Sequence, residues 1–560
     1  MSSSIKKQIE EINKQIYHGN FQEALGIIDK NLKAKELLKE DELNLLNQKC
    51  EIYVYLGEVE KALQIIKKVL KESKGLENVL IYVNTLLNKI QIYYFQGKWK
   101  ELISPCDEGL MLIKNYSKQT KQDVTKENYL LMNIKGWSLF QQGDYENFKE
   151  LVLESKRIGK ESSDPLTKFR SEYYDVTFSR FFGEIKGGAD LFEEIIAKAE
   201  NIGNKFELAI IHGMKASISN TNKEYTKAIE SFQKAIELLK ELNNKILQLQ
   251  IYHDMGLTYR RLMKLDEAIE CFTKTLELDR IQYAGYANLG ICYFWKYDLD
   301  KAEEAYLKAY EFSKEEDDKR FLPYILSNLI ELYIEKGKLD QAQRYLEELN
   351  QHKKETGYQR DEYRYLFASA LLLKASSSMS DWIKGIEIFE ELIKAKGIYE
   401  EIKIKAQFHI LTIRLRELQS TADDKVLQEV YKQIDNLQAE AESKKYYMFQ
   451  IEIYQLKSQL ALLELDIKKA TNLLIAAHTL ADDKGLTLIA QRVISDQEKI
   501  EKQANMWNQL REEKAPLSET LKQISLTDSA KKIAKETLME VRDEESGKII
   551  EYRKLFALKI

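Results

Sequence analysis

Two copies of one pattern lie back to back in residues 249–310, which read LQIYHDMGLTYRRLMKLDEAIECFTKTLELDRIQYAGYANLGICYFWKYDLDKAEEAYLKAY. Each marked residue of the first copy returns 34 positions later, in the pairs Tyr252/Tyr286, Met255/Leu289, Gly256/Gly290, Tyr259/Tyr293, Leu265/Leu299, Ala268/Ala302 and Phe272/Tyr306. A period of this length is typical of repeat architectures in which each unit is a pair of helices.

The spacing inside each copy predicts two helices. Residues 252–259 carry their marked side chains at i, i+3, i+4 and i+7, which is one face of a helix. Ala268 and Phe272 share a face of the second helix in the same way. A glycine in mid-helix costs about 1 kcal/mol relative to alanine, so Gly256 and Gly290 indicate close approach of a neighbour. We expect the aromatic residues to fill the space beside these small ones.

This pattern resembles the tetratricopeptide repeat (TPR), which places a small residue and then an aromatic residue in helix A, and Ala-x-x-x-aromatic in helix B. The resemblance implies an all-α fold, a right-handed superhelical solenoid of antiparallel helical hairpins. It also implies that helix A lines a concave face that binds other proteins.

Weaker copies of the pattern extend over most of the chain and predict about 12 hairpins. The turn and the start of helix B read Gly19-Asn-Phe-Gln-Glu-Ala24 and Gly57-Glu-Val-Glu-Lys-Ala62, and several spacings are close to 40 residues. Repeats of this length resemble a 40-residue TPR variant. We therefore predict a TPR solenoid over residues 1–482, with the best-formed repeats in 210–350.

The pattern stops after residue 482, and we expect residues 483–560 to form a helical cap or a small separate module. Solenoids need such a cap over the last apolar face. Thr487–Glu513 is predicted as one long helix, with a further helix from Pro516 and another over Ser529–Arg542. Lys548–Ile560 fits either a helix or a strand that pairs back through residues 545–547.

Composition limits the classes of function. The 560 residues include only 4 prolines, and charged residues make up 31% with a net charge of −5, so both signs are mixed and no basic block predicts nucleic-acid binding. The 4 cysteines are isolated within helical patterns, which indicates reduced core residues. No signal-peptide core and no run of about 18 apolar residues occurs. We expect a cytoplasmic protein without a membrane partner.

The sequence contains no pattern that predicts catalysis. The 6 histidines have no neighbours at metal-ligand spacing. Phosphate-binding glycine loops and nucleophile elbows are absent as well. We therefore predict a protein that is not an enzyme and holds no metal or cofactor.

Helix-A positions predict which side chains would line the concave groove. One position is polar in four units, where it holds Asn88, Asp254, Asn288 and Asn328. Side-chain amides can donate to and accept from an extended peptide backbone, although asparagine is also frequent in this chain.

Other predicted groove residues are cationic or aromatic: Arg260, Arg261, Phe294, Trp295 and Trp137. Cations beside an aromatic surface would suit an acidic, partly apolar peptide or helix. Packing of Trp295 against the next hairpin is an equally good interpretation.

Three hypotheses about function remain open. The first is a scaffold that binds a peptide or helix of a partner protein on its concave face. The second is a regulatory sensor whose TPR array binds a small ligand or signalling peptide. The third is a structural subunit that assembles with itself. The sequence does not identify the partner or the oligomeric state.

Overall fold

The computed structural model describes the chain except for residues 1–2, 35–36, 97, 142–143, 182–190, 223, 263, 280–282, 297, 316–320, 377, 396–397, 399, 444–446, 484–486, 524–537, 543–548 and 555–560. These described residues form helices almost throughout. The chain divides into two compact units, Met1–Thr258 and Tyr259–Ile560, which are called unit 1 and unit 2 below.

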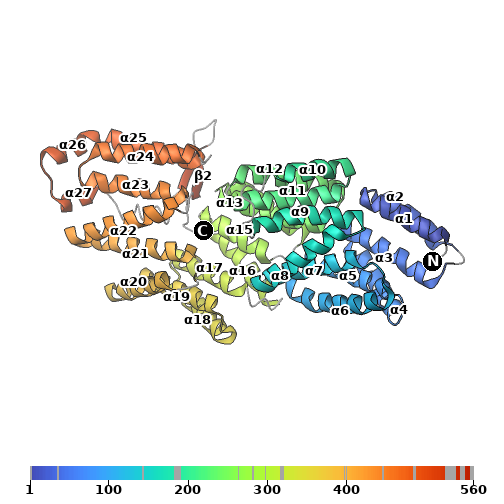
Figure 1. The fold of residues 1–560 in the computed structure, drawn as a ribbon. Helices are drawn as coiled ribbons and strands as arrows, with labels where there is room; N and C mark the ends of the chain where they lie inside the picture. Colours follow the sequence, from blue (N-terminus) through green and yellow to red (C-terminus); the bar gives the residue numbers. More distant parts are fainter. Residues whose placement is uncertain are drawn as a thin grey trace. The chain divides into compact units, whose positions relative to one another are not determined.

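The helices follow one another with short connections (Figure 1). The first half contains α1 (Ser3–Tyr17), α2 (Phe21–Leu32), α3 (Lys39–Tyr55), α4 (Val59–Ser73), α5 (Val79–Phe95), the short 3-10 helix η1 (Trp99–Leu102), α6 (Ile103–Thr120), α7 (Thr125–Gln141), α8 (Tyr145–Glu161), α9 (Pro165–Phe181), α10 (Leu191–Ile202), α11 (Lys205–Thr221), α12 (Tyr225–Glu241) and α13 (Lys245–Arg261). The second half contains α14 (Leu265–Leu278), α15 (Tyr283–Trp295), α16 (Leu299–Glu315), α17 (Leu322–Glu335), α18 (Leu339–Thr356), α19 (Gln359–Ala375), α20 (Met379–Lys394), α21 (Glu400–Thr421), α22 (Asp424–Ser443), α23 (Tyr447–Leu463), α24 (Ile467–Asp483), α25 (Thr487–Lys502), α26 (Ala504–Glu512) and α27 (Leu517–Gln523).

Twelve successive helix pairs, from α1/α2 to α23/α24, make up the described chain before α25. This confirms the predicted all-α solenoid of about 12 hairpins. Several first helices end at a glycine with positive φ, as at Gly57 and Gly337, both at +69°. Glycine adopts this left-handed conformation without the penalty that a Cβ atom brings, so it ends helix A and starts the turn.

The predicted contact between small and large residues is present in the hairpin α15/α16. A Cβ atom added at Gly290 would overlap the ring of Tyr306. Ala302 and Tyr306 are fully buried. The neighbour that excludes a side chain at Gly290 is therefore the aromatic ring of helix B, four residues after the predicted alanine.

A lysine in the last two turns of a first helix, or directly after it, repeatedly contacts an acidic residue on the preceding second helix. Its Nζ atom lies 2.5–2.6 Å from the carboxylate in the pairs Lys49–Asp29, Lys135–Asp107, Lys296–Asp266, Lys336–Asp300 and Lys457–Asp435. Each pair joins neighbouring hairpins. Because the acidic partner is about half exposed or more in each pair, its contribution to stability is small.

The end of the chain corrects two predictions. The long helix predicted over Thr487–Glu513 is two helices, because α25 ends at Lys502 and Gln503 leaves the helical conformation at φ −98° and ψ 3°. Part of the predicted helix Ser529–Arg542 is instead strand β1 (Leu538–Arg542), which pairs antiparallel with β2 (Ile549–Lys554). The strand alternative for the last stretch is thus the correct one over residues 549–554. Short runs of alternating apolar and charged residues fit both periods, and sequence alone could not choose between them.

The helices after residue 482 share a core with the last hairpins. One apolar cluster includes Leu460 of α23, Leu474 of α24, Val493 of α25 and Trp507 of α26. The predicted boundary between a solenoid over 1–482 and a cap or module over 483–560 stays a prediction.

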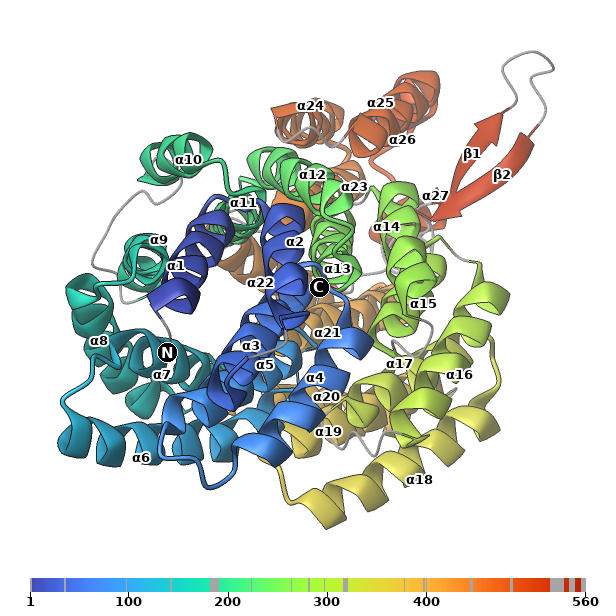
Figure 2. The same ribbon diagram turned by 90° about the vertical axis from the view of Figure 1, so that its right-hand side faces the viewer.

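Unit 1 is closed by contacts between hairpins that are far apart in sequence. One apolar cluster joins Ile16 of α1 and Tyr55 of α3 to Leu166 of α9 and Phe206 of α11. Figure 2 shows α1–α3 beside α9, α11 and α13. Repeat proteins normally contact only their nearest repeats, so this closure is a departure from the general pattern.

Two asparagine side chains link these distant hairpins by hydrogen bonds, and together they are called the asparagine clasp. Asn204 Oδ1 accepts from the backbone N–H of Phe206 at 3.1 Å and so caps α11, while its Nδ2 donates to Tyr17 O at 3.0 Å. Asn244, 40 residues later, makes the two equivalent hydrogen bonds. Its Oδ1 accepts from the backbone N–H of Leu247 at 3.0 Å, and its Nδ2 donates to Tyr55 O at 2.8 Å. Each amide therefore caps one helix and holds the C-terminal end of another.

Candidate functional site

The inner helices of unit 1 meet one another. Arg170 of α9 and Glu207 of α11 are buried and form an ion pair at 2.5 Å. Tyr173 Oη donates to Glu207 Oε2 at 2.8 Å, and Arg170 Nη2 donates to Tyr55 Oη of α3 at 3.1 Å. Side chains of two adjacent hairpins, on α9 and α11, and of one distant hairpin, on α3, thus fill the space that a groove would need.

Burial and the neighbouring charges fix the protonation states of Arg170, Tyr55 and Tyr173 in this cluster. Burial acts to lower the pKa of Arg170, but the Glu207 carboxylate raises it, and the net shift is well upward. Burial raises the pKa of Tyr55 and Tyr173 well above the ordinary value. Arg170 therefore stays charged and both phenols stay neutral at physiological pH, which makes the cluster a structural polar network.

The two predicted groove residues of unit 1 have contacts within the fold. Asn88 is only 5% exposed. Its Nδ2 donates to Asn47 O of α3 at 3.2 Å and so ties α5 to α3. Trp137 is half-buried, with its ring 5.6 Å from Phe140 and 5.8 Å from Phe148 of its own hairpin. Their role as partner-binding residues stays a prediction.

Asp254 and Arg261 lie on α13 and are more accessible. The Asp254 side chain is 48% exposed, and its backbone carbonyl accepts from Thr258 Oγ1 at 2.9 Å. Arg261 is exposed. These two residues keep the access that a ligand-binding side chain requires.

Unit 2 brings together three of the predicted groove residues. Arg260 Nη1 donates to Asn288 Oδ1 at 2.6 Å, and the guanidinium lies over the Trp295 ring at 5.6 Å from its centre. Trp295 is buried and Asn288 is 5% exposed, whereas Arg260 is half-buried. The cation beside an aromatic surface, expected from sequence, is therefore present, with the amide beneath it rather than open to solvent.

The next hairpin differs because its equivalent of Arg260 is apolar. Phe294 follows Arg260 by the 34-residue period, and Asn328 follows Asn288 by 40 residues. Asn328 is 6% exposed, and its Nδ2, like Trp295 Nε1, is buried without a hydrogen-bond partner among the described residues. Buried donors without partners are costly. The predicted groove amides of Asn88, Asn288 and Asn328 are thus buried rather than accessible.

The described residues contain no group of three or more His, Cys, Asp or Glu side chains that could hold a metal ion. All four cysteines are buried and free, as predicted, and burial raises the pKa of Cys271 to about 12. Their thiols are therefore unreactive at neutral pH.

Within the described part of the chain, no helix is long and apolar enough to cross a membrane. The absence of a nucleic-acid partner stays a prediction.

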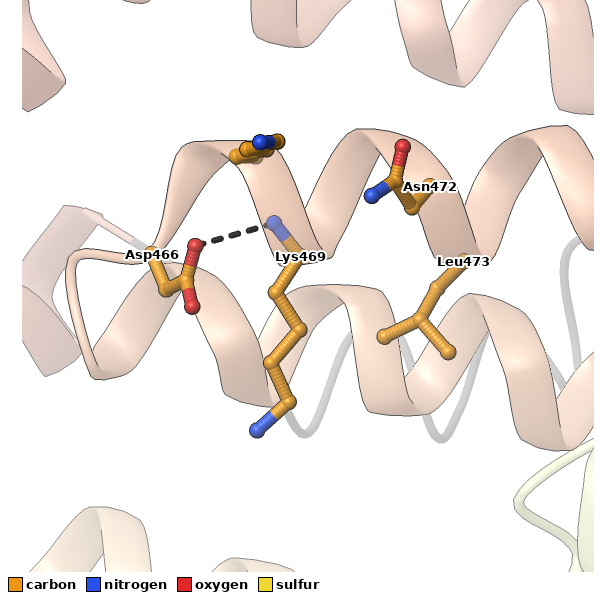
Figure 3. Close-up of a pocket in the computed structure, with 5 residues that line it drawn as sticks. Asp466, Lys469, Asn472 and Leu473 are labelled. Carbon is orange, nitrogen blue, oxygen red and sulfur yellow. Dashed lines mark hydrogen bonds between the residues drawn. The ribbon is translucent and has the colours of Figure 1, made fainter.

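A shallow, open depression lies at the start of α24, away from the predicted groove residues (Figure 3). Its lining comes from one helix and the residue before it: Asp466, Lys468, Lys469, Asn472 and Leu473. Asp466 Oδ1 accepts from the backbone N–H of Lys469 at 2.9 Å, which caps α24. A surface formed by a single helix offers little enclosure for a small molecule.

Sequence reasoning missed the asparagine clasp and the Arg170–Glu207 pair. The dipeptide Asn-Lys does begin α11 and α13, at 204–205 and 244–245, but it also occurs at 13–14, 88–89 and 222–223, so it did not mark the clasp. No signal marked Arg170 or Glu207 either, because charged residues make up 31% of the chain and no motif distinguishes these two.

Comparisons with known proteins agree with the repeat pattern. Two family models described as tetratricopeptide repeat match residues 207–281 and 253–317. A TPR repeat-containing protein of Methanocaldococcus jannaschii is 23% identical over 372 residues, which are 62% of this chain and 59% of that protein. Human Superkiller complex protein 3 is 24% identical over 224 residues, 38% of this chain and 13% of that protein. The matches thus cover less than two thirds of both relatives.

Among solved structures, yeast Tom70 aligns over 90% of this chain and 96% of its own, with 15% identity and a TM-score of 0.35. The period of 34 to 40 residues, the helix pairs and both family matches lead to one conclusion. The chain contains tetratricopeptide repeats, which the family models match over residues 207–317.

Proposed function

We propose that this chain is a protein-interaction scaffold, and that it binds a segment of a partner protein on the first helices of unit 2, around α15 and α17. The observation that supports this most is the Arg260–Trp295–Asn288 assembly. A half-buried guanidinium over an indole ring presents charge and apolar surface together, which suits a segment containing acidic and apolar side chains.

The neighbouring helices extend this surface. Tyr324 and Ile334 of α17 are partly exposed, and the Arg364 guanidinium of α19 lies 5.3 Å from the centre of the Tyr324 ring. In unit 1, by contrast, the corresponding space contains the Arg170–Glu207 pair. These two observations favour unit 2 as the part of the chain that binds the partner.

Affinity purification from the source cell with mass spectrometry tests this proposal. The test variant is Arg260→Ala/Arg261→Ala, and the control is Arg344→Ala/Lys354→Ala, which removes two charges from exposed positions of α18. We expect a partner that is captured by wild type and by the control but lost from the test variant. Equal capture by all three chains would refute binding at this surface.

A further inference from the structure

The C-terminal helix α27 turns back onto the last hairpin. It contacts α23, which also packs against α22 and α24. Leu521 is buried in the apolar cluster of these helices, and Leu517 packs at its edge. Ser518 and Glu519 are exposed. Leu517 and Leu521 stand four residues apart, so α27 is a short amphipathic helix with its apolar side toward α23.

The side chains of α23 are less exposed than those of α17, a first helix in the middle of the solenoid. The second helices of the two hairpins start at Leu339 and Ile467, so residues 128 apart hold equivalent positions on α17 and α23. Tyr324, Ser327 and Ile334 of α17 are partly exposed, whereas their equivalents Glu452, Gln455 and Leu462 are buried. Asp496 of α25 accounts for part of this cover, because it accepts from Gln455 Nε2 at 3.0 Å, and α27 adds to it.

Two features make the attachment of α27 to α23 weak, namely the short length of the helix and the backbone conformation of the connection before it. A helix of 7 residues is too short to be stable by itself. It is joined to α26 through Lys514, whose φ of +50° is unfavourable for a residue with a Cβ atom. Docking on α23 must supply the free energy that orders α27, so this element belongs to the least stable part of the unit.

We propose that the surface of α23 covered by α27 is a docking site for a short amphipathic helix with aliphatic residues at i and i+4. Residues 515–523 occupy this site within the chain, and a partner protein that presents such a helix displaces them. The proposal rests on the proposed function, in that the chain binds protein segments, but it names a different surface and a defined partner chemistry. A tethered segment acts at an effective concentration near the millimolar range, so only an exposed competitor of higher affinity binds.

The test uses the full chain and a fluorescein-labelled peptide of residues 513–524, EKAPLSETLKQI, with binding followed by fluorescence polarisation. The variant Leu517→Glu/Leu521→Glu releases α27, and we expect it to bind the peptide at least ~tenfold more tightly than wild type because the tethered competitor is gone. The control variant Ser518→Ala/Glu519→Ala changes the exposed side of α27 and should bind like wild type. Equal affinity of the released variant and wild type, both with native circular dichroism, would overturn the proposal.

A second variant keeps the test decisive if the released variant does not fold. Lys514→Gly removes the backbone strain before α27 and favours the docked state, so we expect several-fold weaker capture of the same peptide. Unchanged capture would overturn the proposal. Because the probe is the chain's own segment, a negative result here leaves the partner test at Arg260 and Arg261 unaffected, and the two failures are distinguishable.

Discussion

Substituting alanine for Gly57 tests whether contacts between distant hairpins stabilise unit 1. Gly57 and Gly337 end their helices with the same φ of +69°. The capping bonds match as well: Gly57 N donates to Val54 O and Gly337 N to Ile334 O, each at 3.1 Å. Only the surroundings differ. A Cβ atom at Gly57 would lie 3.1 Å from Asn244 Oδ1 and 3.2 Å from its Cα, whereas a Cβ atom at Gly337 would have nothing within 4 Å.

The magnitudes follow from this difference. Both alanine variants incur the cost of a left-handed residue, about 1–2 kcal/mol. Gly57→Ala also forces Asn244 to move within a tightly packed region, which adds about 1–3 kcal/mol. Gly337→Ala is therefore the matched control, and the difference between the two losses measures the effect of the clasp. In Gly57→Ala/Asn244→Ala the side-chain oxygen is gone but the backbone of residue 244 stays close, so we expect a loss smaller than the sum of the single changes.

Hydrogen exchange measured by mass spectrometry gives the opening free energy of each helix. In Gly57→Ala we expect the loss to extend beyond α3 and α4 to α13, which is remote in sequence but is capped by Asn244. In Gly337→Ala the loss should stay within α17 and α18. Equal losses for the two variants, within about 0.5 kcal/mol, would refute the inference that the clasp stabilises unit 1.

Three further predictions use urea unfolding. Gly290→Ala should cost about 1–3 kcal/mol, because the new methyl group overlaps the Tyr306 ring. Asn288→Ala should cost about 1–2 kcal/mol, since it removes a buried acceptor of Arg260; a loss below about 0.5 kcal/mol would instead fit a solvent-facing groove residue. Burial and two nearby lysines lower the pKa of His212 from 6.5 to about 4. Its contribution to stability is complete above pH 6.5 and is lost as pH falls toward 4, so His212→Gln should remove about 2–3 kcal/mol of the acid sensitivity seen between pH 7 and 4.5.

The candidate site was predictable in part. The repeat register brought Arg260, Asn288 and Trp295 onto one surface, because equivalent positions of neighbouring hairpins lie side by side. Their exposure was not predictable in the same way. Asn288 and Asn328 are both buried, and burial of a residue at this position depends on how closely the neighbouring helices pack around it. A single sequence records both residues but not the distance between the helices that carry them.

The sequence by itself determined the features that arise within about 40 residues: the helix pairs, the glycine turns and the close approach of Gly290 and Tyr306. These depend on helical periodicity and on side-chain size, and both are local. Only the tertiary structure decided that Asn204 and Asn244 hold the C-terminal ends of α1 and α3, and that Arg170 meets Tyr55 of α3 in the interior. Such contacts depend on a small rotation between successive hairpins that accumulates over several repeats, and no local pattern records that sum.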